Sequence, residues 1–189
     1  MKKFTLIVAA LFVAASLFAQ DAQWGVKGGL NIASEVAGER STDSRVGIHL
    51  GGFMEKAIST GLDFQVEFLY SMQGATYRYG GTDHIDKLDY LNVPVMIKIY
   101  LNQNRRFSID VGTQLGFLVS AKVTAGNSTT NVYNNDKMQK LDVSLGIGLS
   151  YKLNDNLDLV FRGNQGLTPI VDGLDHKNSV VQLGVGYRF

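Results

Sequence analysis

The C-terminal stretch V-V-Q-L-G-V-G-Y-R-F, residues 180–189, decides the fold. Read back from the end, every second residue is apolar and the first two are aromatic: Phe189, Tyr187, Val185, Leu183 and Val181. The residues between them are small or polar: Arg188, Gly186, Gly184 and Gln182. Because successive side chains of a strand point to opposite faces, this pattern predicts a strand with one apolar and one polar face.

The N-terminus carries the pattern of an export signal. Lys2 and Lys3 precede an uncharged run over residues 4–18, and the first acidic residue is Asp21. A basic start followed by a short apolar run is typical of a secretory signal peptide. The run is about 15 residues, shorter than the roughly 20 that a spanning helix needs, which disfavours a retained membrane anchor. We therefore expect residues 1–19 to be a cleaved signal peptide, with a boundary within about two residues, and residues 20–189 to form one domain.

Composition limits the classes of function. Of 18 basic side chains, loss of Lys2 and Lys3 leaves 16 against 17 acidic ones, so the mature net charge is about −1. This balance offers no argument for a nucleic-acid partner. The chain has no cysteine, which excludes disulfides and any cysteine-based metal site or nucleophile. Its 21 glycines suit a tightly curved sheet with a crowded interior.

The same alternation recurs seven more times before the C-terminal strand. Short connections and long polar connections alternate along the chain, as in transmembrane barrels with short periplasmic turns and longer outer loops. Pro94 interrupts one strand, where we expect a bulge or a lost ladder bond. The sequence thus predicts an all-β, eight-stranded antiparallel up-and-down transmembrane β-barrel, with strands over residues 24–32, 46–56, 62–73, 89–101, 106–122, 139–153, 157–167 and 180–189.

A soluble, lipocalin-like barrel has the same alternation of side chains. In such a barrel the alternate apolar side chains, here called the apolar parity, point inward around a ligand, and the remaining side chains, the polar parity, point outward. Two features favour lipid on the apolar side. The polar parity is rich in Gly, Asp, Gln and Ser, which suits a small barrel filled by its own side chains. The apolar parity carries aromatics near strand ends, as in interfacial belts: Trp24, Tyr70, Phe107, Tyr151, Tyr187 and Phe189. We therefore expect the cell outer membrane as the location and its lipid as the surroundings.

Three motifs together resemble a known family. G-V-K-G-G-L-N at residues 25–31, Y-L-N-V-P-V-M-I-K at 90–98 and L-G-V-G-Y-R-F at 183–189 are similar to the outer-membrane β-barrel family of Bacteroidetes that includes PorT-like proteins. That resemblance implies no shared catalytic residues and allows a role in a secretion or motility apparatus. The last strand also resembles the segment that the barrel assembly machinery recognises, with Phe189 and Tyr187 as the assembly signal.

The polar parity holds charges of both signs. Isolated charges in a narrow lumen are costly, so they are expected to pair. The residues expected to form a lumen charge network are Glu67, Lys98, Asp110 and Arg162. Charges at strand ends are expected to face water instead: Glu55, Lys152 and Asp158.

No arrangement of side chains points to catalysis. His49 shares the polar parity with Ser144 and Ser150, but nothing in the sequence places a base beside either serine. We expect no enzyme activity, metal or cofactor. The expected function is a structural or interaction role through long outer loops, with an unidentified envelope protein as partner. The alternatives are a PorT-like role, and a narrow channel or small-ligand binder.

Overall fold

The computed structural model describes residues 22–37 and 40–189. The predicted signal peptide lies outside the described residues. Within them, no helix is long and apolar enough to cross a membrane.

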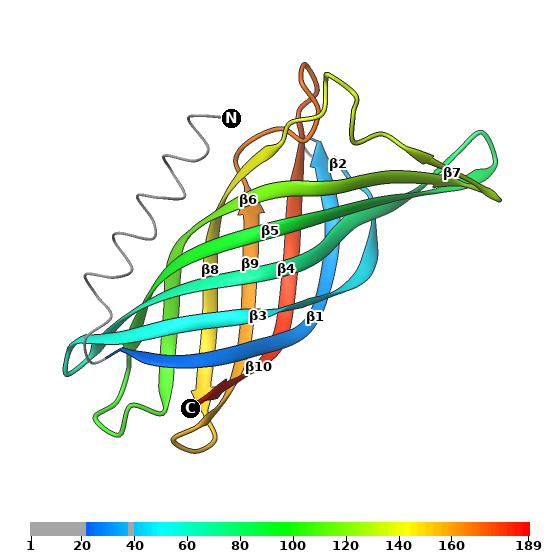
Figure 1. Ribbon diagram of the computed structural model, residues 1–189. Helices are drawn as coiled ribbons and strands as arrows, with labels where there is room; N and C mark the ends of the chain where they lie inside the picture. The colour runs from blue at the N-terminus through cyan, green and yellow to red at the C-terminus, as the bar shows by residue number, and fades with distance from the viewer. Residues whose placement is uncertain (1–21, 38–39) are drawn as a thin grey trace.

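Eight strands form one closed antiparallel wall (Figure 1). The barrel closes where the first and last strands pair, from Gly25↔Arg188 to Ala37↔His176. Two further short strands, β2 (Arg40–Ser41) and β7 (Ser128–Asn131), lie in the connections. The predicted eight-stranded barrel is therefore confirmed, with a wall of β1 (Gln23–Ala37), β3 (Asp43–Ser59), β4 (Leu62–Tyr79), β5 (Thr82–Tyr100), β6 (Phe107–Ala125), β8 (Leu141–Lys152), β9 (Leu157–Gly166) and β10 (His176–Arg188).

The apolar parity faces outward and the polar parity is buried. Leu50, Ile147 and Leu183 are 63%, 65% and 59% exposed, although each is a large aliphatic side chain. The alternate side chains point into the barrel, and many charged and amide groups among them are buried. An outward apolar band with a polar interior is the arrangement of a transmembrane barrel and the inverse of a lipocalin.

The outer connections differ from the prediction. Residues 74–87, expected to form a polar loop, instead extend β4 and β5 into a hairpin that turns at Gly80 and Gly81. Both glycines have positive φ, 59° and 79°, which a tight two-residue hairpin turn requires. The predicted loop over residues 34–45 is likewise mostly strand, in β1, β2 and β3. The tips of β4–β5 and β6–β7 consequently project beyond the other strands (Figure 1).

Pro94 lies inside β5, and the ladder to β4 is interrupted there as expected. Pairing stops at Val66↔Val95 and resumes at Leu69↔Asn92 in the same register. On its other side, β5 pairs with β6 through Pro94 itself. A proline lacks the N–H that the ladder needs, so one side of the strand loses bonds while the other continues.

Candidate functional site

The centre of the lumen holds a buried trio that we call the central cluster: Lys27, Glu67 and Arg162. Arg162 binds the Glu67 carboxylate with both terminal nitrogens, Nη2–Oε1 2.7 Å and Nη1–Oε2 3.1 Å. Lys27 Nζ donates to the same two oxygens at 3.0 and 3.1 Å. These residues come from β1, β4 and β9, so the trio ties distant parts of the wall together across the lumen.

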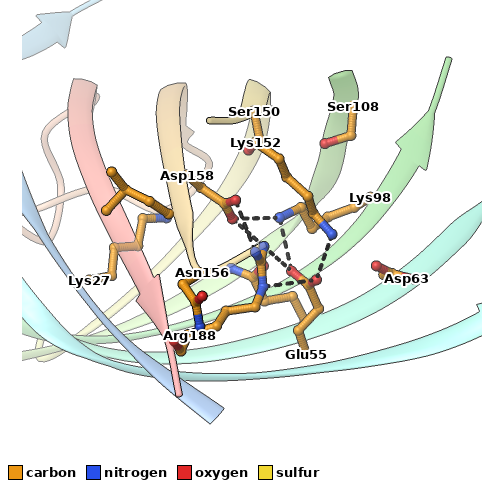
Figure 2. Close-up of polar contacts among 12 residues, drawn as sticks. Lys27, Glu55, Asp63, Lys98, Ser108, Ser150, Lys152, Asn156, Asp158 and Arg188 are labelled. Atoms are coloured by element: carbon orange, nitrogen blue, oxygen red, sulfur yellow. Dashed lines mark hydrogen bonds and ion pairs between the residues drawn. The ribbon is translucent and has the colours of Figure 1, made fainter. Parts of the chain in front are cut away.

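A second group, which we call the basal cluster, comes from strand positions close to the short turns. Figure 2 shows its ion pairs. Lys98 Nζ lies 2.9 Å from Glu55 Oε2 and 3.6 Å from Asp158 Oδ2. Arg188 pairs with Asp158 and places its Nε 3.3 Å from Glu55 Oε1. Lys152 Nζ lies 3.8 Å from the same Glu55 oxygen. Two carboxylates and three cations thus close the base of the barrel.

Asp110 is buried near the basal cluster but has a different kind of partner. Its carboxylate accepts hydrogen bonds from Ser108 Oγ, at 2.8 Å, and from Ser150 Oγ. Asp110 and Lys98 are directly opposed in the β5–β6 register. Hydroxyl donors satisfy the carboxylate, and the neighbouring ammonium adds favourable charge.

All four residues predicted for the lumen network face inward and are buried: Glu67, Lys98, Asp110 and Arg162. Glu67 and Arg162 contact each other directly, while Lys98 contacts Glu55 and Asp158. Both of these residues were expected to face water, and that expectation was wrong, because they are 2% and 3% exposed. Lys152, with a side chain 21% exposed, also reaches inward to Glu55. The tilt of the strands brings these ends over the lumen, which strand position alone cannot indicate.

Above the central cluster lies an uncharged layer of amides. Asn31 Nδ2 donates to Ser71 Oγ at 3.0 Å, and Asn31 Oδ1 accepts from His49 Nδ1 at 2.8 Å. Gln182 Nε2 donates to the same Asn31 oxygen at 3.1 Å, and Gln182 Oε1 accepts from Asn164 Nδ2 at 3.1 Å. These side-chain hydrogen bonds run along five consecutive strands of the wall, β4, β3, β1, β10 and β9.

An apolar cluster, which we call the apolar cap, lies at the outer mouth. The connection between β7 and β8 and the connection between β9 and β10 pack over the inner faces of β5 and β6. The two connections pair with each other through the bridge Met138↔Val171. The Gln139 N–H donates to the Ile170 carbonyl at 2.9 Å, and the Asp172 N–H to the Lys137 carbonyl at 2.7 Å. The buried members of the cap are Leu88, Tyr90, Leu118, Ala121 and Ile170, with Val132, Tyr133, Met138 and Val171 packed against them.

Two carboxyl groups lie at the outer rim, above the exposed apolar band. Glu35 of β1 and Asp86 of β5 both point inward there, and His176 Nδ1 lies 3.8 Å from Glu35 Oε2. Burial, with repulsion from Asp86 added, raises the pKa of the Glu35 carboxyl to about 7. Burial also raises the pKa of Asp86. The prediction missed this pair because both positions were read as loop, although Asp86 continues the parity of Leu88.

The residues of the predicted assembly signal lie on the outer wall. Tyr187 and Phe189 are exposed, with ring centroids 6.0 Å apart in an edge-on arrangement. The Phe189 N–H donates to the Trp24 carbonyl at 3.0 Å, which extends the seam between the first and last strands. Their role in assembly stays a prediction.

The described residues, 22–37 and 40–189, contain no group of three or more His, Cys, Asp or Glu side chains placed to hold a metal ion. The interior polar groups are instead used for ion pairs and amide contacts. The arrangement defines a membrane barrel filled from base to mouth.

Comparison with known families agrees with that class. A family model described as the outer membrane protein beta-barrel domain matches residues 18–172. The chain belongs to this family, and its location is the cell outer membrane. A comparison with curated proteins gave no match.

Similar folds occur among solved structures. Ail, the attachment invasion locus protein of Yersinia pestis, is 16% identical with a TM-score of 0.56, covering 89% of this chain and 99% of Ail. Ail in complex with the heparin analogue sucrose octasulfate is similar at 17% identity and a TM-score of 0.54, with the same coverage. Neisserial surface protein A is 18% identical, with a TM-score of 0.55 and coverage of 89% and 99%. At these identities the likeness concerns the fold.

Proposed function

We propose that this chain is a non-enzymatic outer-membrane barrel with a closed lumen, which acts through its projecting outer rim. The observation that carries the proposal is the filling of the lumen at successive levels: the basal and central clusters, the amide layer and the apolar cap. A barrel filled in this way has no continuous space for solute, so the surface left for recognition is the outside.

The projecting hairpins supply that surface. The strand β7 is exposed along its whole length, Ser128–Asn131. At the neighbouring tip, Arg78 and Asp83 are exposed and form an ion pair at 3.4 Å. Strands joined by tight turns hold such side chains in place better than flexible loops do, which suits contact with an envelope protein or a neighbouring surface.

Shortening both hairpins tests the proposal. Replacing residues 78–83 by Asn-Gly leaves Tyr77 and His84 paired beside a two-residue turn, and replacing 124–129 does the same for Val123 and Thr130. The trimmed barrel should assemble and show the usual gel shift on boiling. In a strain lacking the protein, it should fail to restore detergent resistance, whereas the full chain restores it. Full restoration by the trimmed barrel would overturn the proposal.

Two finer roles can be tested with the same strains. The resemblance to PorT-like proteins supports a second candidate, a part in secretion or motility, for which loss of secreted cargo on deletion is the expected result. The complex of Ail with a heparin analogue suggests sulfated glycans as probes for the rim. Binding of such a glycan by the full chain and not by the trimmed barrel would assign the rim a glycan ligand.

A further inference from the structure

The outer wall of β1, β3 and β4 contains a groove near the short turns. The groove has a volume of about 170 Å³, and its walls include Trp24, Phe68 and Phe189. Gly52 faces outward in its floor, where the absence of a side chain leaves the depression. Met54 also faces outward but is only 3% exposed, because the side chains around the groove cover it.

The groove continues toward the periplasmic edge of the wall. A second depression is lined by Lys56, Ala57, Ile58 and Phe64. Lys56 pairs with Phe64 in the β3–β4 register, two residues along each strand from the pair Met54↔Val66. The two depressions therefore follow one another along the same strands, and Lys56 lies roughly 13 Å from Gly52.

Lys56 is distinctive on this surface. It is the one charged residue among the outward-facing positions of residues 24–32, 46–58 and 62–70, all of which are described. A single cation thus stands at the membrane edge, below an apolar, aromatic-walled groove.

We propose that this groove binds one anionic phospholipid of the periplasmic leaflet, with an acyl chain over Gly52 and the phosphate at Lys56. The apolar walls match a hydrocarbon chain, and the distance from Gly52 to Lys56 matches part of its length. An ammonium group near a membrane surface attracts anionic headgroups, enough for about a fivefold preference over a zwitterionic lipid. The site is independent of the rim and of its proposed function.

The single tryptophan of the chain, Trp24, reports directly on occupancy. The mature protein is refolded into vesicles of brominated phosphatidylcholine, whose bromines quench tryptophan fluorescence. Unlabelled phosphatidylglycerol or unlabelled phosphatidylcholine is then mixed in at equal mole fractions. In the wild type, the recovery of Trp24 fluorescence should be about fivefold larger with phosphatidylglycerol than with unlabelled phosphatidylcholine.

Variants separate a built site from the general lipid shell. Lys56→Gln should abolish the preference, and Lys56→Arg should keep it. Gly52→Leu should also abolish it by filling the groove; a Cβ there meets only the Gly25 carbonyl oxygen, at 3.5 Å, so the backbone can accept it. Gly163→Leu is the matched control on the far wall, where a Cβ would lie 4.0 Å from the Ile147 carbonyl oxygen.

Each variant is first checked for the gel shift of a folded barrel. Equal recovery with both lipids in the wild type would overturn the proposal, because the lipid at Trp24 would then follow the bulk composition. Retention of the preference in Lys56→Gln, or its loss in Gly163→Leu, would overturn it as well.

Discussion

Glu67 holds the central cluster together, because its single carboxylate pairs with both Lys27 and Arg162. Replacing it by Gln keeps the shape and removes the charge, which leaves Lys27 and Arg162 buried together without a counter-ion. Removing one partner of a buried pair costs about 3–5 kcal/mol. We expect Glu67→Gln to lower the free energy of unfolding in urea by about 3 kcal/mol.

The control for that substitution is Asp83→Asn, which removes a carboxylate paired with Arg78 where both side chains are about 70% exposed. Exposed pairs contribute little, so the urea midpoint should stay nearly unchanged. Equal midpoints for the wild type and Glu67→Gln would contradict the pairing described here.

Phe189 is the second residue whose role can be isolated. We expect Phe189→Ala to reduce the amount of heat-modifiable barrel in the outer membrane, because the barrel assembly machinery is expected to recognise the terminal aromatic. Phe161→Ala removes a ring of the same size from the lipid face of β9, where Phe161 is 51% exposed. If both variants assemble equally well, the terminal ring has no special role in assembly.

At the scale of elements, the outer ends of β1 and β10 should respond to pH. Glu35 faces His176 on β10, Asp86 on β5 and Tyr77 on β4. Because folding raises the pKa of Glu35 from 4.5 to about 7, the folded state favours its protonated form. That contribution is fully present below pH 4.5 and is lost as the pH rises through 7. We expect a higher urea midpoint at pH 5 than at pH 8.

Substitutions identify the group that causes this pH dependence of the urea midpoint. Glu35→Gln should flatten it between pH 5 and 8, and Asp86→Asn should shift it to lower pH by removing a repelling charge. His176→Gln tests whether the imidazole contributes. An unchanged pH dependence in Glu35→Gln would show that another group is responsible.

The apolar cap gives a second prediction at this scale. Ile170 is buried against β5 and β6, so Ile170→Ala should loosen the two connections that form the cap, at a cost of about 2–4 kcal/mol to their local stability. Trypsin should then cut faster after Lys137 and Lys140 in the reconstituted barrel. Leu174→Ala, an exposed position on the same connection, is the control. Equal cleavage rates in the two variants would argue against a packed cap.

At the scale of the whole molecule, the filled lumen predicts an electrically silent barrel. Ions would have to cross two clusters of fixed ion pairs, a hydrogen-bonded amide layer and an apolar cap. We expect no conductance steps from the wild type in a planar bilayer, in conditions where a porin gives clear steps. Stable, reproducible steps would favour the narrow-channel alternative.

Much of this architecture could be predicted because alternation is a local property. A period of two in residues 180–189 and in seven other stretches is enough to predict strands, their number and their two faces. The effect of Pro94 could be predicted for the same reason. The missing N–H of this one residue explains why the β4–β5 ladder is interrupted there. The outer hairpins were missed because polar residues near Gly80 and Gly81 suit a projecting strand pair as well as they suit a loop.

The alternation along the chain was enough to predict the strand count, the orientation of the two faces and the presence of opposite charges inside. Which of these charges meet could be seen only in the folded barrel. Glu67 and Arg162 are 95 residues apart in the chain, and Glu55 and Arg188 are 133 residues apart. Their contact depends on the tilt and stagger of a closed sheet, which is set by the register of all eight wall strands together. The same closure buried Glu55 and Asp158 and produced the rim pair, the apolar cap and the Gly52 groove.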